Sequence, residues 1–168
     1  FTVEQVAVQG GGSLSLHFAE SFGLVYLLSG VLHLTIAGRD IRVKPNEYVL
    51  FGENQRGMAH ACGEEPCALS LARVRPGYLA ESGRSGEDLT SFFRHPRLPD
   101  CCLIDSQHNT NLLLRDLRAR LSRTETGLFA MESYRHSVAI MVVVLAGRAF
   151  HSCLRNTPIR GQHTVAVD

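Results

Sequence analysis

The sequence predicts a mainly β domain that is followed by helices, and three observations lead to this prediction. Residues 1–75 alternate apolar and polar side chains in short runs, which is the two-residue period of half-buried strands. From residue 85 onward, apolar side chains recur at the three- and four-residue spacing of amphipathic helices. The length of 168 residues, with 45% hydrophobic and 20% charged side chains, suits one globular domain. We therefore expect a barrel or sandwich of short strands, then a short helix and an antiparallel pair of long helices.

The strand predictions depend on alternation and on turn residues. In Val31–Ile36, Leu32, Leu34 and Ile36 share one face, and His33 and Thr35 share the other. Ala37-Gly38 then interrupts the pattern before Ile41 and Val43 resume it, which predicts a hairpin whose turn uses the positive φ that Gly38 tolerates. The other strong candidates are Ser13–Phe18, Glu47–Phe51 and Cys67–Val74. The weaker candidates are Val3–Val8, Leu24–Leu28 and Met58–Cys62, which gives some seven short strands in all.

The helix predictions begin after Arg75-Pro76-Gly77. Ser85-Gly86-Glu87-Asp88 resembles a capping sequence, and Leu89, Phe92 and Phe93 supply one apolar face before His95-Pro96, so we predict a helix of two to three turns. Pro99–Ile104 is predicted to be an extended link. A first long helix begins at Ser106 or Asn109, and a second runs from about Leu128 to Leu154. We accordingly divide the chain into a barrel with a short helix (1–105), a helix pair (106–156) and a linker (157–168).

Composition excludes several classes of protein. The net charge of +1 excludes a polycationic nucleic-acid tail and an acidic disordered chain. The longest apolar run, Val138–Ala146, is shorter than the roughly 20 residues of a membrane span, and no secretory signal is visible at the start. The five cysteines include no CxxC pair, which favours a reducing compartment, so we predict a cytoplasmic protein. We expect each cysteine to be a small buried hydrophobic residue. Because the first residue is Phe1, we expect a fragment of a longer chain.

The most informative stretch runs from Val25 to Phe51, VYLLSGVLHLTIAGRDIRVKPNEYVLF. This stretch has the hairpin order of a small jelly roll: a strand that ends in Ser29-Gly30, a second strand, a turn at Gly38, a third strand, a turn that contains a proline, and a fourth strand. This order resembles the cupin barrel, and in particular the amino-terminal sensor domain of AraC-family transcription regulators. Asn46 replaces the family's usual glycine and Glu47 its aspartate, and asparagine tolerates positive φ. The resemblance covers roughly residues 14–155, because the family also places a short helix and two antiparallel helices after the barrel.

Many cupins are metal enzymes, so the positions of the family's metal ligands matter. The resemblance places the two histidines of that motif near Leu16 and Phe18 and the glutamate near Gly23, and none of these residues binds metal. His17 points to the opposite face, and His60 alone occupies the place of the last histidine. We therefore predict no metal, no cofactor and no enzymatic activity. A small cupin isomerase or dioxygenase and a stand-alone ligand-binding cupin are the alternatives.

The resemblance implies a regulatory domain that senses an effector and dimerises, with DNA bound only by a helix-turn-helix domain outside this chain. The subgroup that it resembles includes activators of type III secretion and virulence genes, so the effector is a small molecule or a regulatory protein. A small molecule is expected to enter between the two sheets. The residues predicted to line this pocket are Phe18, Tyr26, His33 and Phe51, with His60 at the rim. A one-residue slip of a strand would exchange these residues for their neighbours.

The helix pair carries the predicted homodimer interface. Leu113, Leu117 and Leu121 form an apolar stripe on the first long helix, and arginines flank it. In the resembling family such a stripe faces a second subunit; the alternative is that both helices pack on the barrel. The apolar run Val138–Ala146 cannot read DNA, because a recognition helix needs polar and basic tips. No membrane partner is expected.

Overall fold

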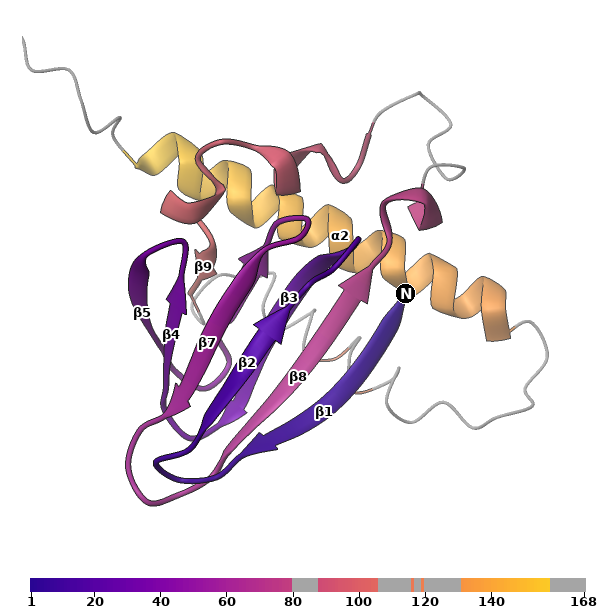
Figure 1. The fold of residues 1–168 in the computed structure, drawn as a ribbon. Helices are drawn as coiled ribbons and strands as arrows, with labels where there is room; N and C mark the ends of the chain where they lie inside the picture. Colours follow the sequence, from indigo (N-terminus) through magenta and orange to yellow (C-terminus); the bar gives the residue numbers. More distant parts are fainter. Residues whose placement is uncertain (80–87, 106–115, 117–118, 120–130, 158–168) are drawn as a thin grey trace, which may run out of the picture.

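Two antiparallel β-sheets face each other, and one long C-terminal helix lies beside them (Figure 1). The computed structural model describes residues 1–79, 88–105, 116, 119 and 131–157. This arrangement is the predicted mainly β fold, a cupin-like barrel followed by a helix. The predicted first long helix, from Ser106 or Asn109, lies almost wholly outside the described residues, and so does most of the tail 157–168.

The described residues form nine strands, three 3₁₀ turns and, after these, one long helix. The strands are β1 (Thr2–Val8), β2 (Ser13–His17), β3 (Phe22–Ser29), β4 (Leu32–Ile36), β5 (Arg39–Val43), β6 (Tyr48–Phe51), β7 (Arg56–Ala61), β8 (Cys67–Val74) and β9 (Leu103–Ile104). The 3₁₀ turns are η1 (Pro76–Leu79), η2 (Ser91–Arg94) and η3 (Leu98–Asp100), and the helix is α2 (Met131–Asn156). One sheet has the order β1-β8-β3-β6-β9 and the other has the order β2-β7-β4-β5.

The hairpin β4-β5 forms as the sequence predicts. Leu32, Leu34 and Ile36 are buried between the sheets, whereas His33 and Thr35 are exposed. The two turn residues, Ala37 and Gly38, both have positive φ, at 50° and 72°. This two-residue turn matches the right-handed twist of the strands that it joins. Asn46 also has positive φ, at 69°, which explains why asparagine can stand where the resembling family has glycine.

Strand β3 is buried on both faces. Gly23 is paired with Phe51 and lies against the Phe18 ring, so its face looks between the sheets. Phe22, Leu24 and Tyr26 alternate with this face and therefore point away from the interior, toward the layer that covers the five-stranded sheet. Such a strand lacks a polar face, which is why its sequence FGLVYLLS does not alternate.

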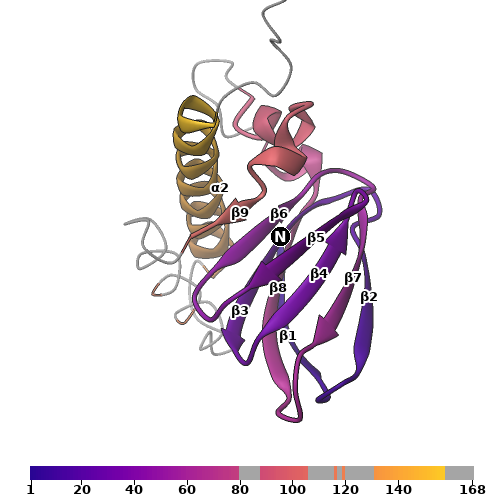
Figure 2. The same cartoon turned by 90° about the vertical axis from the view of Figure 1, so that its left-hand side faces the viewer.

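A chain of aromatic rings joins the barrel to α2. The ring of Phe22 on β3 stacks on Phe93 of η2, with centroids 4.7 Å apart and planes 8° apart. Phe93 in turn packs on Phe92 at 4.1 Å, and Phe92 packs on Phe150 of α2 at 5.9 Å. Figure 2 shows the resulting order of layers, with the 3₁₀ turns and α2 beside the sheet that contains β3 and β6. Aromatic pairs of this kind add to the free energy of burying their area.

Two segments that follow the barrel strands differ from their predictions. In place of a short α-helix of two to three turns, the part of it that is described is the single 3₁₀ turn η2. The Asp88 carboxylate accepts hydrogen bonds from the backbone and the hydroxyl of Thr90 just before η2. The turn ends at His95, whose backbone is extended, because a residue that precedes proline disfavours the helical conformation. The predicted extended link Pro99–Ile104 overlaps η3 and contains the two-residue strand β9. The second long helix is α2, close to its predicted bounds.

Helix α2 combines length with high apolarity. Its residues Glu132–Asn156 are long and apolar enough, by length and composition, to cross a membrane, and 44% of an apolar 18-residue window within this segment is buried inside the protein. Val138, Val143, Ala146 and Phe150 are nearly or fully inaccessible to solvent. A core helix of a folded domain has the same length and apolar content, and α2 packs on Phe92 through Phe150 in this way.

Candidate functional site

The interior of the barrel is occupied by aromatic and aliphatic side chains. Phe18 packs on Phe51 with ring centroids 4.7 Å apart, and both side chains are fully inaccessible to solvent. The Phe18 ring also lies against Gly23, where an added Cβ would be 2.0 Å from the nearest ring atom. The guanidinium of Arg73 lies 4.6 Å from the centroid of the same ring and donates a hydrogen bond to the carbonyl of His17. Two of the five predicted pocket residues, Phe18 and Phe51, therefore do lie between the sheets.

Tyr26 lies on the other face of β3. It is three residues beyond Gly23, and side chains alternate along a strand, so Tyr26 points away from the interior. It is buried under the outer layer, in register with Tyr48 and Ser70, and its hydroxyl donates to the side-chain oxygen of Asn46 at 3.1 Å. Its predicted place inside the pocket is wrong, because β3 is apolar on both faces and its pattern does not reveal which face looks inward.

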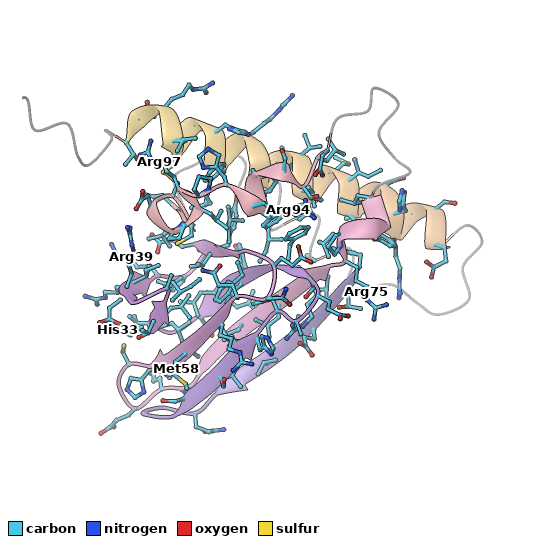
Figure 3. All side chains as sticks on the ribbon, turned by 45° about the horizontal axis from the view of Figure 1, so that its top comes forward. His33, Arg39, Met58, Arg75, Arg94 and Arg97 are labelled. Carbon is cyan, nitrogen blue, oxygen red and sulfur yellow. The ribbon has the colours of Figure 1, made fainter. Side chains whose placement is uncertain are left out.

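His33 and His60 lie on the outside of the four-stranded sheet. They are directly opposite each other on β4 and β7, both are exposed, and Nδ1 of His60 is 3.0 Å from the Ser13 hydroxyl. Their predicted positions in the pocket and at its rim are wrong, because Leu34 and Ala59 occupy the inward-facing positions next to them. Figure 3 shows His33 and Met58 on the side of the barrel remote from α2. Met58, on the same outer face, is 46% exposed.

The positions that the resemblance assigns to metal ligands are filled by apolar packing. Leu16 and Phe18 are buried, and the Phe18 ring occupies the space in front of Gly23 where a ligand side chain would have to project. His17 is exposed on the outer face, as alternation predicts. Within residues 1–79, 88–105 and 131–157, no group of three or more histidine, cysteine, aspartate or glutamate side chains could hold a metal ion. The residues present at these positions do not fit a cupin metal centre.

The residues of the predicted dimer interface, Leu113, Leu117 and Leu121, all lie outside the described residues. On α2, which the structure does describe, two large apolar side chains face solvent: Tyr134 is 41% exposed and Met141 is 44% exposed.

A groove between η2 and α2 is a feature that the sequence analysis did not identify. It has a volume of about 630 Å³, and Phe92, Val143 and Gly147 contribute apolar surface to it. Arg148, His151 and Arg155, at i, i+3 and i+7 of α2, give the same groove a basic margin, and all three are exposed. The spacing of these three residues at the end of an otherwise apolar helix is the signal that would have predicted a basic face there.

The Asp88 carboxylate is the acidic group of this groove, and Leu89 and Ser91 line the groove beside it. The hydroxyl of Thr90 donates to the Asp88 carboxylate at 2.6 Å and holds the pKa of that carboxyl below its ordinary value, and the Thr90 backbone and Arg94 act in the same direction. Asp88 therefore stays ionised at neutral pH and is paired with Arg94, whose guanidinium also lies 4.9 Å from the Phe22 ring centroid.

Comparison with known proteins gives no match at the level of sequence. No family model matches the chain, and no curated protein does. Among solved structures, the chain is similar to ToxT from Vibrio cholerae in two crystal structures. The P21 form gives a TM-score of 0.56 at 11% identity over 97% of this chain and 60% of that one; ToxT of strain O395 gives 0.58 at 10% identity over 94% and 55%. A predicted oxalate decarboxylase from Thermotoga maritima gives 0.41 at 14% identity over 44% of this chain and 64% of that one.

The likeness to ToxT extends from the barrel into the helical part, because it includes nearly the whole chain. This chain spans 55% to 60% of the length of the ToxT chains that it matches. At such low identity the comparison shows a shared fold. ToxT is an AraC-family protein, so the resemblance that the sequence predicts is confirmed at the level of the fold.

Proposed function

We propose that this chain is the regulatory domain of an AraC-type transcription activator, which senses an effector and dimerises while a helix-turn-helix domain outside this chain binds DNA. The single observation that carries the proposal is the likeness to ToxT over 94% to 97% of this chain, which includes the barrel and the helical part together. A barrel alone would be equally compatible with a small cupin enzyme or with a stand-alone binding module.

The packing around Phe18 also favours regulation over catalysis. A cupin enzyme needs three or four protein ligands to hold a catalytic metal. Leu16, Phe18 and Gly23 supply none, and the Phe18 ring fills the space in front of Gly23. The enzyme alternative would therefore have to use a site elsewhere on the molecule.

The same packing bears on how an effector would act. In the described part of the barrel interior, Phe18 and Phe51 are in contact and inaccessible to solvent. A small molecule would have to displace one of these rings to bind between them. This favours an effector that binds outside the barrel, and a regulatory protein suits such a surface better than a small molecule does.

The proposal is tested by measuring whether the protein dimerises and whether a change in the predicted interface abolishes the dimer. Leu117 is the central residue of the Leu113, Leu117, Leu121 stripe, and Leu117→Glu would place a charge in an apolar seam between subunits, where an unpaired ion is strongly unfavourable. We expect sedimentation to show a dimer for the unchanged protein and a folded monomer for Leu117→Glu. Arg118→Glu is the matched control, because it changes the charge of the neighbouring residue without entering the stripe, and it should remain dimeric.

The functional half of the test uses a reporter. The chain is fused to a heterologous DNA-binding domain that occupies its operator only as a dimer, and reporter repression is measured. The unchanged and Arg118→Glu fusions should repress, whereas Leu117→Glu should not. An unchanged chain that sediments as a monomer at micromolar concentration and fails to repress would contradict the proposal. If circular dichroism shows that Leu117→Glu is unfolded, the stripe packs on the barrel and the dimer seam is not there.

A further inference from the structure

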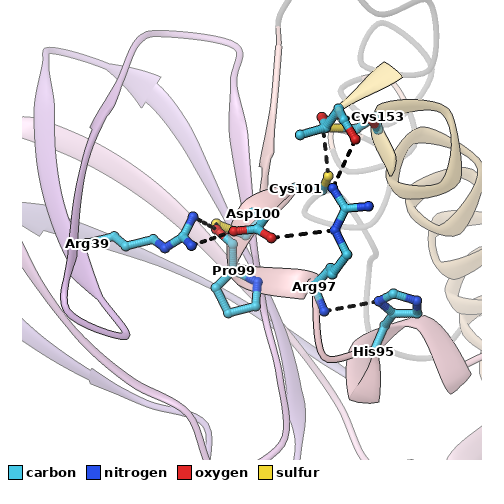
Figure 4. Close-up of polar contacts among 9 residues, drawn as sticks. Arg39, His95, Arg97, Pro99, Asp100, Cys101 and Cys153 are labelled. Carbon is cyan, nitrogen blue, oxygen red and sulfur yellow. Dashed lines mark hydrogen bonds and ion pairs between the residues drawn. The ribbon is translucent and has the colours of Figure 1, made fainter. Parts of the chain in front are cut away.

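Two thiols from distant parts of the chain meet at the end of α2. Cys101 directly follows η3, and Cys153 lies in the last turns of α2. Their sulfur atoms are each 3.7 Å from the hydroxyl oxygen of the same residue, Thr157. Figure 4 shows the two cysteines next to each other, with Arg97 beside them.

Surrounding contacts hold this arrangement in place. The Thr157 hydroxyl donates to the carbonyl of Cys153 at 2.9 Å, so its oxygen has a fixed position at the helix end. The guanidinium of Arg97 donates to the carbonyl of Thr157 at 3.0 Å and is 3.5 Å from the Asp100 carboxylate. Asp100 is also paired with Arg39 of β5. The thiol pair therefore lies where the end of α2 is anchored to the barrel.

From this geometry we propose that Cys101 and Cys153 form a redox-modification site, in which a disulfide oxidant of the glutathione type converts the thiol pair into an intramolecular disulfide that joins α2 to the barrel. The thiols differ in access. Cys153 is half-buried, whereas Cys101 is buried, so the oxidant meets Cys153 first. Cys101 then resolves the mixed disulfide from inside the protein.

The chemistry balances without any further reactant. The Cys153 thiolate attacks one sulfur of glutathione disulfide, which forms a mixed disulfide and releases one glutathione thiolate. The Cys101 thiol then loses its proton and attacks the Cys153 sulfur, and the second glutathione thiolate leaves. Two protein thiols are oxidised to one disulfide, and one glutathione disulfide is reduced to two glutathione thiols that take up the two protons.

The electrostatics set the rate of this reaction. Burial raises the pKa of the Cys101 thiol, and the neighbouring Cys153 thiol raises it further, while the Thr157 hydroxyl and the Arg97 guanidinium lower it. A raised pKa leaves little thiolate at neutral pH, so the resolving step is slow at neutral pH and faster in alkaline buffer. The neighbouring Cys102 is a different case. Its pKa is raised to about 11 by burial, and its thiol donates to the carbonyl of Pro99, not to Thr157.

The test is the disulfide map of the unchanged protein. Fully reduced chain is incubated without oxygen in excess glutathione disulfide, quenched with acid, alkylated and digested, and the peptides are identified by mass spectrometry under non-reducing conditions. We expect a peptide pair joined through Cys101 and Cys153, a monomeric band on a non-reducing gel, and faster formation at pH 9 than at pH 7. The oxidised form should unfold at a temperature roughly 5–15 °C higher than the reduced form.

Three variants supply the controls. Cys101→Ser and Cys153→Ser should each abolish the cross-link and the rise in unfolding temperature, and Cys101→Ser should accumulate the mixed disulfide on Cys153. Cys102→Ser, the adjacent buried cysteine, should keep both. A map that shows only a Cys62–Cys67 cross-link, an intermolecular disulfide or five unmodified thiols would overturn the proposal, and this map does not depend on whether a variant folds.

Discussion

Gly23→Ala offers a sharp test of how the barrel interior is packed. The added Cβ would lie 2.0 Å, 2.2 Å and 2.4 Å from three atoms of the Phe18 ring. To reach an ordinary contact of 3.4 Å, the closest ring atom must move by 1.4 Å, which is the difference between the two distances. The ring has little room for this movement, since Phe51 packs on it with centroids 4.7 Å apart and the Arg73 guanidinium lies 4.6 Å from its centroid.

The expected magnitude follows from two opposing contributions. Overpacking of a core costs about 1–3 kcal/mol, and the upper half of that range applies where the obstructing side chain is itself enclosed. Replacing glycine by alanine in a strand returns about 0.5–1 kcal/mol, because the unfolded chain loses less conformational freedom. We expect a net loss of about 1–2.5 kcal/mol in the free energy of unfolding, or a fall of about 2–10 °C in the unfolding temperature.

Urea denaturation followed by circular dichroism measures this loss, with the slope of the transition unchanged. Gly77→Ala is the matched control, since a Cβ at Gly77 would meet nothing within 4 Å, and its effect should stay within about 0.5 kcal/mol. In a Phe18→Leu background the ring is gone, so Gly23→Ala should become neutral or stabilising. The reasoning is refuted if Gly23→Ala has the same effect in both backgrounds, or no effect in the unchanged protein.

Two further predictions concern the layer that covers the five-stranded sheet. The pKa of Asp88 is lowered in the folded protein, first by the Thr90 hydroxyl, so its contribution to stability is present above the ordinary value of 3.8 and is lost as the pH falls through the lower folded value. The difference in urea stability between the unchanged protein and Asp88→Asn should therefore be constant from pH 7 to pH 5 and vanish in stronger acid. A chain truncated after Asp105 should give a poorly dispersed NMR spectrum and bind a hydrophobic dye, because it lacks the Phe150 ring that packs on Phe92; a well-dispersed spectrum would contradict this.

The strands that could be predicted from the sequence are those with one face buried and the other exposed to solvent. In β4, Leu32, Leu34 and Ile36 alternate with His33 and Thr35, and the structure has the same alternation. That pattern puts His33 on the polar face, opposite to a pocket position, so its predicted place in the pocket, which depends on its size alone, is wrong. His60 is harder to place from the sequence, because its inward neighbours Ala59 and Ala61 are small and give a weak apolar signal.

The residues that could not be placed from the sequence lie where both faces are buried or where a side chain replaces regular structure. Tyr26 belongs to a strand with no polar face, so nothing in its neighbours shows which way it points. The segment before η2 contains helix-like capping residues, and the Asp88 carboxylate bonds Thr90 two residues ahead, but the described part of the predicted helix contains only the 3₁₀ turn η2. The apolar spacing of Leu89, Phe92 and Phe93 does not distinguish a 3₁₀ turn from an α-helical one, because both place residues three apart on one face.

The double burial of β3 has a consequence for regulation. On one face, Gly23 supports the Phe18 and Phe51 rings of the barrel interior; on the other, Phe22 is the first ring of the stack that continues through Phe93 and Phe92 to α2. A displacement of the Phe18 ring presses on the backbone of Gly23, and that backbone carries Phe22 one residue away. Because close-packed interiors transmit strain, an event inside the barrel and an event at the end of α2 are connected by one short strand. A regulatory domain of the proposed kind needs such a connection between its barrel and its helices.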